Sequence, residues 1–154
     1  MTLEVDVQVA CDDDDLPGRA DLRAWASAAV GALREDAELT IRIVDEAESM
    51  RLNSRYRNKD GATNVLSFPF DAPAGVDLPL LGDIVVCAPV VRREAKQQSK
   101  SVSSHWAHMV VHGSLHLLGF DHEQARDADE MEAMETRILA ALGFDNPYES
   151  RGLS

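Results

Sequence analysis

Cysteine is nearly absent from this chain of 154 residues. Its two cysteines, Cys11 and Cys87, lie far apart and match no Cys-x-x-Cys spacing. Disulfide frameworks and thiolate zinc sites both require paired or clustered cysteines. The sequence therefore argues against both, and it agrees with a reducing compartment.

Long apolar runs are also missing. No stretch approaches the roughly 20 apolar residues of a transmembrane helix, and the first six residues carry acids where a secretory signal needs basic and then apolar residues. We therefore expect a cytoplasmic protein without membrane contact. The length and the 45% hydrophobic content fit one globular domain spanning residues 1–154.

Basic residues are outnumbered, with 15 Lys and Arg against 27 Asp and Glu and a formal net charge of −12. Such a chain is a poor general ligand for nucleic acid, because the phosphate backbone rewards clustered cations. Much of the acidity is confined to two segments, 12–15 and 127–135. Basic residues form two groups away from both segments and could contact phosphate locally: Arg51, Arg55, Arg57 and Lys59, and later Arg92, Arg93, Lys96 and Lys100.

Hydrophobic periodicity predicts four strands and several helices. Strict alternation marks residues 2–10, and β-prone segments follow at 39–43, 64–68 and 82–87, the last more continuously apolar and so central. Helical spacing covers 21–34, 45–56, the segment from Pro89, the segment through 118, and 123–142. These elements predict an α+β fold with α/β-like order: a single small mixed sheet of about four strands, flanked by helices.

Three histidines near the end of one predicted helix form the main candidate site. His112 and His116 are four residues apart, so their imidazoles leave the same helix face and can share one ion. Gly119 suits a left-handed helix stop that turns the chain, which would return His122 towards the other two. Three neutral imidazoles suit Zn²⁺ and leave a fourth position open, which is the catalytic pattern.

The spacing of these histidines and of Gly119 matches the long zinc-protease signature HExxHxxGxxH at all positions but one. Gly113 stands where those proteases carry the glutamate that serves as general base. A peptidase or amidase therefore remains an alternative that lacks its base. His105 and His108 precede the site on the same helix, and we interpret them as packing residues or as supports of the metal ligands.

Two motifs resemble those of the YbeY family, bacterial metal-dependent endoribonucleases associated with ribosomal RNA maturation. Residues 112–122 read HGSLHLLGFDH, similar to the family's HGxLHLxGYDH, with Phe120 in place of tyrosine. Residues 56–60 and 63–69 are similar to its YRxKDxPTNVLSFP, with Ala62 at the proline position. The resemblance runs from about residue 38 onward and is weak before it.

This resemblance implies a fold, a cofactor, a substrate and partners. The family's fold is a small mixed sheet flanked by helices, in agreement with the pattern above. His112, His116 and His122 would hold one Zn²⁺ per chain, and Arg57 would be the basic residue important for activity. The substrate would be small-subunit ribosomal RNA, cleaved as a single strand, with the ribosome and its proteins as partners and no nucleotide cofactor.

The chemistry suits hydrolysis of a phosphodiester. Zinc would lower the pKa of its water to about 7 and polarise a phosphoryl oxygen, while Arg57, with Arg55 and Lys59, would bind phosphate. The proton acceptor stays open between zinc hydroxide, Asp121 and the RNA's own 2′-hydroxyl. Asp121 could instead orient a ligand imidazole. A ribosome-assembly factor with structural zinc and little catalysis is the second alternative.

Overall fold

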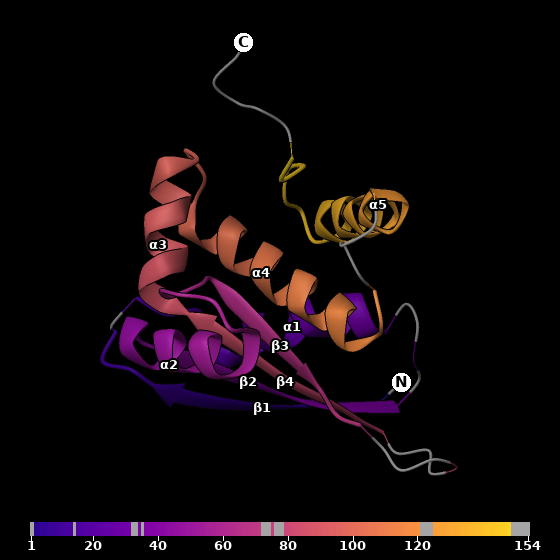
Figure 1. Ribbon diagram of the computed structural model, residues 1–154. Coiled ribbons are helices and arrows are strands. Elements are labelled where there is room, and N and C mark those ends of the chain that lie inside the picture. Colours follow the sequence, from indigo (N-terminus) through magenta and orange to yellow (C-terminus); the bar gives the residue numbers. More distant parts are fainter. Residues whose placement is uncertain are drawn as a thin grey trace.

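The computed structural model describes residues 2–13, 15–31, 34, 36–71, 75, 79–120 and 125–148. Strands and helices alternate in the first part of the chain, and helices follow alone after the last strand (Figure 1). The elements are β1 (Thr2–Ala10), α1 (Arg19–Val30), β2 (Asp36–Val44), α2 (Glu46–Arg57), β3 (Val65–Pro69), β4 (Leu80–Cys87), α3 (Ala88–Gln97), α4 (Val102–Leu117) and α5 (Ala125–Ala141).

The four strands form one mixed sheet in the order β1-β2-β4-β3. β1, β2 and β4 are mutually parallel, and β3 pairs with β4 in the antiparallel sense at the edge. Parallel neighbours require a crossover, and α1 provides it between β1 and β2. The predicted α+β class and mixed sheet are confirmed, and β4 lies inside the sheet as its apolar run predicted.

Alternating side chains of the strands feed two separate cores. Ile84 and Val86 of β4 join the larger core, which lies between the sheet and helices α1, α4 and α5. Val85 and Cys87, on the opposite face, join a smaller core with residues of α2 and α3. Figure 1 shows α4 running across the sheet, with α5 packed against α4 on the side away from the strands.

Helix α4 begins and ends at clear signals. The hydroxyl of Ser101 accepts a hydrogen bond from the backbone N–H of Ser104, which caps the first turn. At the other end Gly119 has φ +101°, and the N–H groups of Gly119 and Phe120 donate to the carbonyls of His116 and Leu115. These two bonds form a Schellman motif, so the predicted stop at Gly119 is confirmed.

Several boundaries differ from the prediction. Helix α1 begins at Arg19 and ends at Val30, and not at 21 and 34. Strand β4 begins at Leu80, two residues before its predicted start. Strand β2 begins at Asp36, three residues before its predicted start, and pairs in register with β1 from Thr2 onward. Ala37 is buried in phase with Leu39 and Ile41, so the alternating segment already begins at this alanine. Among the described residues, no helix is long and apolar enough to cross a membrane.

Candidate functional site

The side chains of His112 and His116 meet on the last turns of α4. Their Nε2 atoms lie 3.1 Å apart, as the four-residue spacing predicted. Each ring is anchored through its other nitrogen: Nδ1 of His112 lies 3.3 Å from Oε1 of Glu135, and Nδ1 of His116 lies 2.9 Å from the carbonyl oxygen of Phe120.

These anchors determine the tautomers of the two rings. A carboxylate and a carbonyl can only accept, so Nδ1 carries the proton in both neutral imidazoles. Both Nε2 atoms then present lone pairs to each other at 3.1 Å. Two lone pairs at this distance repel each other unless a cation lies between them, either a proton shared by the two rings or a metal ion. Two zinc bonds of about 2.0–2.1 Å at a tetrahedral angle place nitrogens roughly 3.3 Å apart, so the donor pair fits a metal ion.

The other two predicted residues of the motif, Asp121 and His122, lie outside the described residues. The three-histidine ligand set therefore stays a prediction, as does either role for Asp121. His112 and His116 are only partly buried, and both line a cavity.

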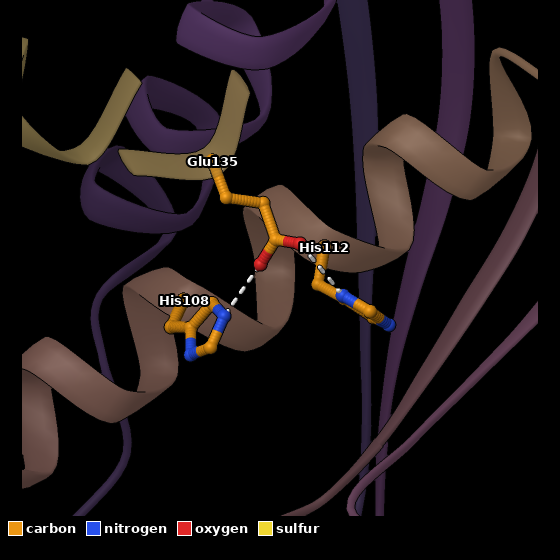
Figure 2. Close-up of side chains that lie close together, drawn as sticks. All are labelled: His108, His112 and Glu135. Atoms are coloured by element: carbon orange, nitrogen blue, oxygen red, sulfur yellow. Dashed lines mark hydrogen bonds and ion pairs between the residues drawn. The ribbon is translucent and has the colours of Figure 1, made fainter. Parts of the chain in front are cut away.

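A buried carboxylate, Glu135 of α5, lies behind His112 and was not predicted as a site residue. Its side chain is 1% exposed and lies between two rings of α4, with Oε2 at 2.5 Å from Nε2 of His108 (Figure 2). The hydroxyl of Tyr148 also donates to Oε2, at 2.8 Å. The ligand atoms of His108, His112 and Glu135 all lie within 4.8 Å of one another, so this group could hold a metal ion.

The environment keeps Glu135 ionised. Burial acts to raise its pKa, but hydrogen bonds from His108 and His112, together with the electrostatic effect of those rings, lower the pKa to about 2. Burial raises the pKa of Tyr148, and the neighbouring carboxylate raises it further. Tyr148 therefore remains a neutral hydroxyl that donates to a permanent anion.

Gly113 faces the sheet and not the histidine site. A Cβ at this position would lie 2.8 Å from Cγ2 of Ile84 and 3.2 Å from Oγ of Ser67. The hydroxyl of Ser67 donates to the carbonyl of Gly113 at 3.1 Å, which holds α4 close to β3. A glutamate side chain has no room here, so the difference from the zinc-protease signature is a consequence of helix packing.

A cleft of about 510 Å³ joins the histidines to the basic end of α2. Its described lining is Asn53, Arg57, Lys59, Thr63, Asn64, Val65, Leu66, Ser67, Pro69, His112 and His116. Arg57 is fixed there by a hydrogen bond of 2.5 Å from Nη2 to the carbonyl of Ser67. Two motifs that are more than 40 residues apart in the sequence thus form one cavity.

Arg55 is the predicted phosphate contact that the structure does not bring to this cleft. It is exposed, and its guanidinium lies 5.4 Å from the ring centroid of Tyr56. Tyr56 is itself 53% exposed and packs edge-to-face on Phe68. The guanidinium of Arg57 lies over the same Phe68 ring at 5.4 Å. Tyr56 and Phe68 line a separate pocket with Val85, on the face of the sheet opposite the histidines.

The two remaining histidines of α4, His105 and His108, are buried, and each lies next to a carboxylate. These positions agree with the predicted role as packing residues or supports of the metal ligands. His105 is 3% exposed, with Nε2 at 2.9 Å from Oε1 of Glu94 on α3. Burial lowers the pKa of His105 despite the opposing effect of Glu94. It is therefore a neutral donor that ties α4 to α3.

The chain is similar to known proteins in sequence and in fold. The family model described as Endoribonuclease YbeY matches residues 10–143, so the similarity reaches further towards the N-terminus than the motifs alone indicated. The solution structure of TM1509 from Thermotoga maritima superposes with a TM-score of 0.57 at 22% sequence identity. It covers 93% of this chain and 99% of its own, and at that identity it supports the fold alone.

Proposed function

The chain belongs to the YbeY endoribonuclease family, and from this premise we propose that it is a zinc-dependent, single-strand-specific endoribonuclease. Its substrate is small-subunit ribosomal RNA, cleaved during maturation and ribosome quality control in the cytoplasm. Ribosomal RNA and the ribosome are its partners, ribosomal proteins are candidate contacts, and no nucleotide cofactor is involved.

The observation that carries the proposal is the shared cleft. His112 and His116, whose tautomers direct lone pairs at one point, line the same cavity as Arg57 and Lys59. A metal-binding pair next to two cations suits a substrate that carries negative charge at the bond to be hydrolysed.

His112, His116 and His122 would hold the ion, one per chain, since imidazole nitrogens are donors that zinc prefers. When bound, zinc supplies a Lewis acid for the phosphoryl oxygen and a hydroxide at neutral pH. Among the residues of the chain, Asp121 is a candidate proton acceptor or an orienting partner of a ligand ring.

Arg57 is the residue we assign to the phosphate. Among the described residues its one hydrogen bond goes to the Ser67 carbonyl, so further N–H donors of the guanidinium remain for a ligand. A planar fork of donors matches two phosphate oxygens better than an ammonium does. Lys59 adds a second positive charge in the same cavity.

We base the preference for single strands on the family to which the chain belongs. The peptidase alternative loses support, because the position of its catalytic glutamate is occupied by Gly113 against the sheet.

Zinc content and RNA cleavage should be measured together, on wild type and on three variants, with single-stranded and duplex ribosomal RNA fragments. We expect His116→Ala to lose both zinc and cleavage. Arg57→Ala should keep zinc and lose about 10²–10³-fold in cleavage rate, as for removal of one oxyanion donor. Arg55→Ala is the matched control outside the cleft and should retain both.

Three outcomes would contradict the proposal. Unchanged cleavage in His116→Ala and Arg57→Ala would place the nuclease activity elsewhere. Ribosome binding that persists in all variants, without any cleavage by wild type, would favour the assembly factor with structural zinc. Chelator-sensitive cleavage of a peptide and not of RNA would restore the peptidase.

A further inference from the structure

Glu135, Tyr148 and His108 form a buried hydrogen-bond network behind His112. We propose that Glu135 is a positioning residue: its carboxylate fixes the Nδ1–H tautomer of His112 and strengthens that ring as a metal ligand. The inference rests on the proposed metal site and adds to it a support from a different helix. Figure 2 shows the carboxylate reaching from α5 to both histidines of α4.

The geometry separates a supporting role from direct ligation. Oε1 of Glu135 faces Nδ1 of His112, whereas Nε2 of the same ring faces His116 at 3.1 Å. The two nitrogens are on opposite sides of an imidazole, so an ion shared by His112 and His116 lies across the ring from Glu135. The carboxylate then accepts the Nδ1–H bond and does not enter the coordination sphere.

The second oxygen of Glu135 is also occupied. Oε2 accepts from Nε2 of His108 at 2.5 Å and from the Tyr148 hydroxyl at 2.8 Å. Three donors therefore compensate the cost of burying this charge at 1% exposure. With both oxygens held, the carboxylate has one orientation, and it determines the orientation of the His112 ring.

The partner ligand is held in another way. Nδ1 of His116 donates to the carbonyl of Phe120, a neutral acceptor in the turn after its own helix. His112 donates to a full negative charge on α5. A carboxylate behind a ligating imidazole raises the basicity of the ligand nitrogen more than a carbonyl does, so His112 is the stronger donor of the pair.

The test is zinc affinity, measured by competition with a chromophoric chelator on purified, metal-stripped protein. Glu135→Gln preserves the shape and removes the charge, and we expect zinc to bind 10–100-fold more weakly at unchanged stoichiometry. Asp129→Asn makes the same chemical change at an exposed position of α5 and should leave affinity unchanged. Tyr148→Phe removes one donor to Glu135 and should weaken zinc binding by about threefold to tenfold.

The tautomer of His112 is a second measurement, and it would not change if Glu135 only stabilised the fold. In metal-free protein at pH 8, imidazole nitrogen NMR should report His112 with the proton on Nδ1. In Glu135→Gln the same ring should show a mixture of tautomers, while His116 remains Nδ1-protonated. If Glu135→Gln fails to fold, both measurements are made on Tyr148→Phe. Tyr148 is half-exposed, so its substitution disturbs the fold less.

Zinc affinity and His112 tautomer that stay as in wild type would overturn the inference. Complete loss of zinc in Glu135→Gln, equal to that in His116→Ala, would also overturn it and make Glu135 a ligand. Both measurements are made without RNA. A wild type that binds zinc but cleaves no RNA would therefore end the proposed function and leave this inference standing.

Discussion

At the scale of single residues, Gly113 has the most instructive position. It follows a metal-ligating candidate directly, at the place of the protease glutamate, yet its Cα faces Ile84 and Ser67 of the sheet. Helix α4 approaches the strands so closely that a methyl group has no space. The missing side chain is thus required by the fold, independently of catalysis.

The sign of the change in the free energy of unfolding in Gly113→Ala tests this packing. Alanine is about 1 kcal/mol better than glycine inside a helix, so without a steric conflict the substitution would stabilise the protein. A Cβ at 2.8 Å from the fully buried Ile84 should reverse the sign and destabilise by about 1–3 kcal/mol. Urea unfolding at equilibrium measures the difference.

Ser103→Ala provides the control for Gly113→Ala, because Ser103 is an exposed position on the same helix. Its free energy of unfolding should change by about 0.5 kcal/mol or less. An increase in stability for Gly113→Ala would show that α4 can move away from the sheet without cost. The packing explanation for the missing glutamate would then fail.

Site residues differ in how far the sequence could predict them. The spacing of His112 and His116 predicted their meeting, and Gly119 predicted the turn, because each depends on local helix geometry. Glu135 could not be found this way. It lies among the acids of α5, and only the docking of α5 on α4 makes it a buried partner of His112.

At the scale of elements, a polar contact ties three segments together around α4. Nε2 of His105 meets Oε1 of Glu94 on α3, and the side-chain amide of Asn64, just before β3, donates to the same oxygen at 3.0 Å. Asn64 also lines the cleft. The packing of α3 on α4 therefore helps to position the wall of the proposed active site.

This contact predicts a pH dependence of stability. Burial lowers the pKa of His105 below its ordinary 6.5, against the effect of Glu94, with His108 and Lys100 as further charged or titratable neighbours. Below pH 6.5 the unfolded chain binds a proton that the folded protein does not bind. Stability should therefore fall as pH decreases from 6.5, until the pH reaches the folded-state pKa.

Urea unfolding at pH 7.5 and pH 5.5, in the presence of a chelator, measures this dependence. His105→Gln retains a donor for Glu94 but does not titrate, so its loss of stability between the two pH values should be smaller than in wild type. All other titratable groups are common to both proteins, so their contributions cancel in the comparison. Equal losses would mean that folding does not lower the pKa of His105.

The sequence predicted most elements but not their arrangement. Apolar alternation and caps indicated all four strands and the helices between them, because these signals are local. Strand order and the antiparallel edge position of β3 were not predictable from local patterns. The early start of β2 was not predicted because Ala37, which continues the alternation, is a weak strand signal, and pairing with β1 brings it into the strand.

At the scale of the whole molecule, the protein is an anion that is proposed to act on a polyanion. The net charge of −12 repels RNA at a distance, while Arg57 and Lys59 attract it inside one cleft. Binding should consequently depend on few ionic contacts and on the metal site. A broad basic surface would instead bind RNA tightly, with a strong salt dependence, whatever the structure of the RNA.

The salt dependence of RNA affinity measures how many contacts there are. Each phosphate neutralised on a single strand contributes about −0.7 to the slope of log K against log salt. Arg57 and Lys59 together therefore contribute about −1.4, to which a phosphate bound at the metal site adds. Lys59→Ala should reduce the steepness by about 0.7. Both values can be measured by titrating a fluorescent single-stranded RNA with zinc-loaded protein, in which His116 is unchanged, at several salt concentrations.

The control is Lys96→Ala, at an exposed position of α3 away from the cleft lining, which should leave the slope unchanged. A slope several units steeper, or one that falls equally in Lys96→Ala, would place the RNA on a wider surface that includes α3, because only additional cations can release additional counterions.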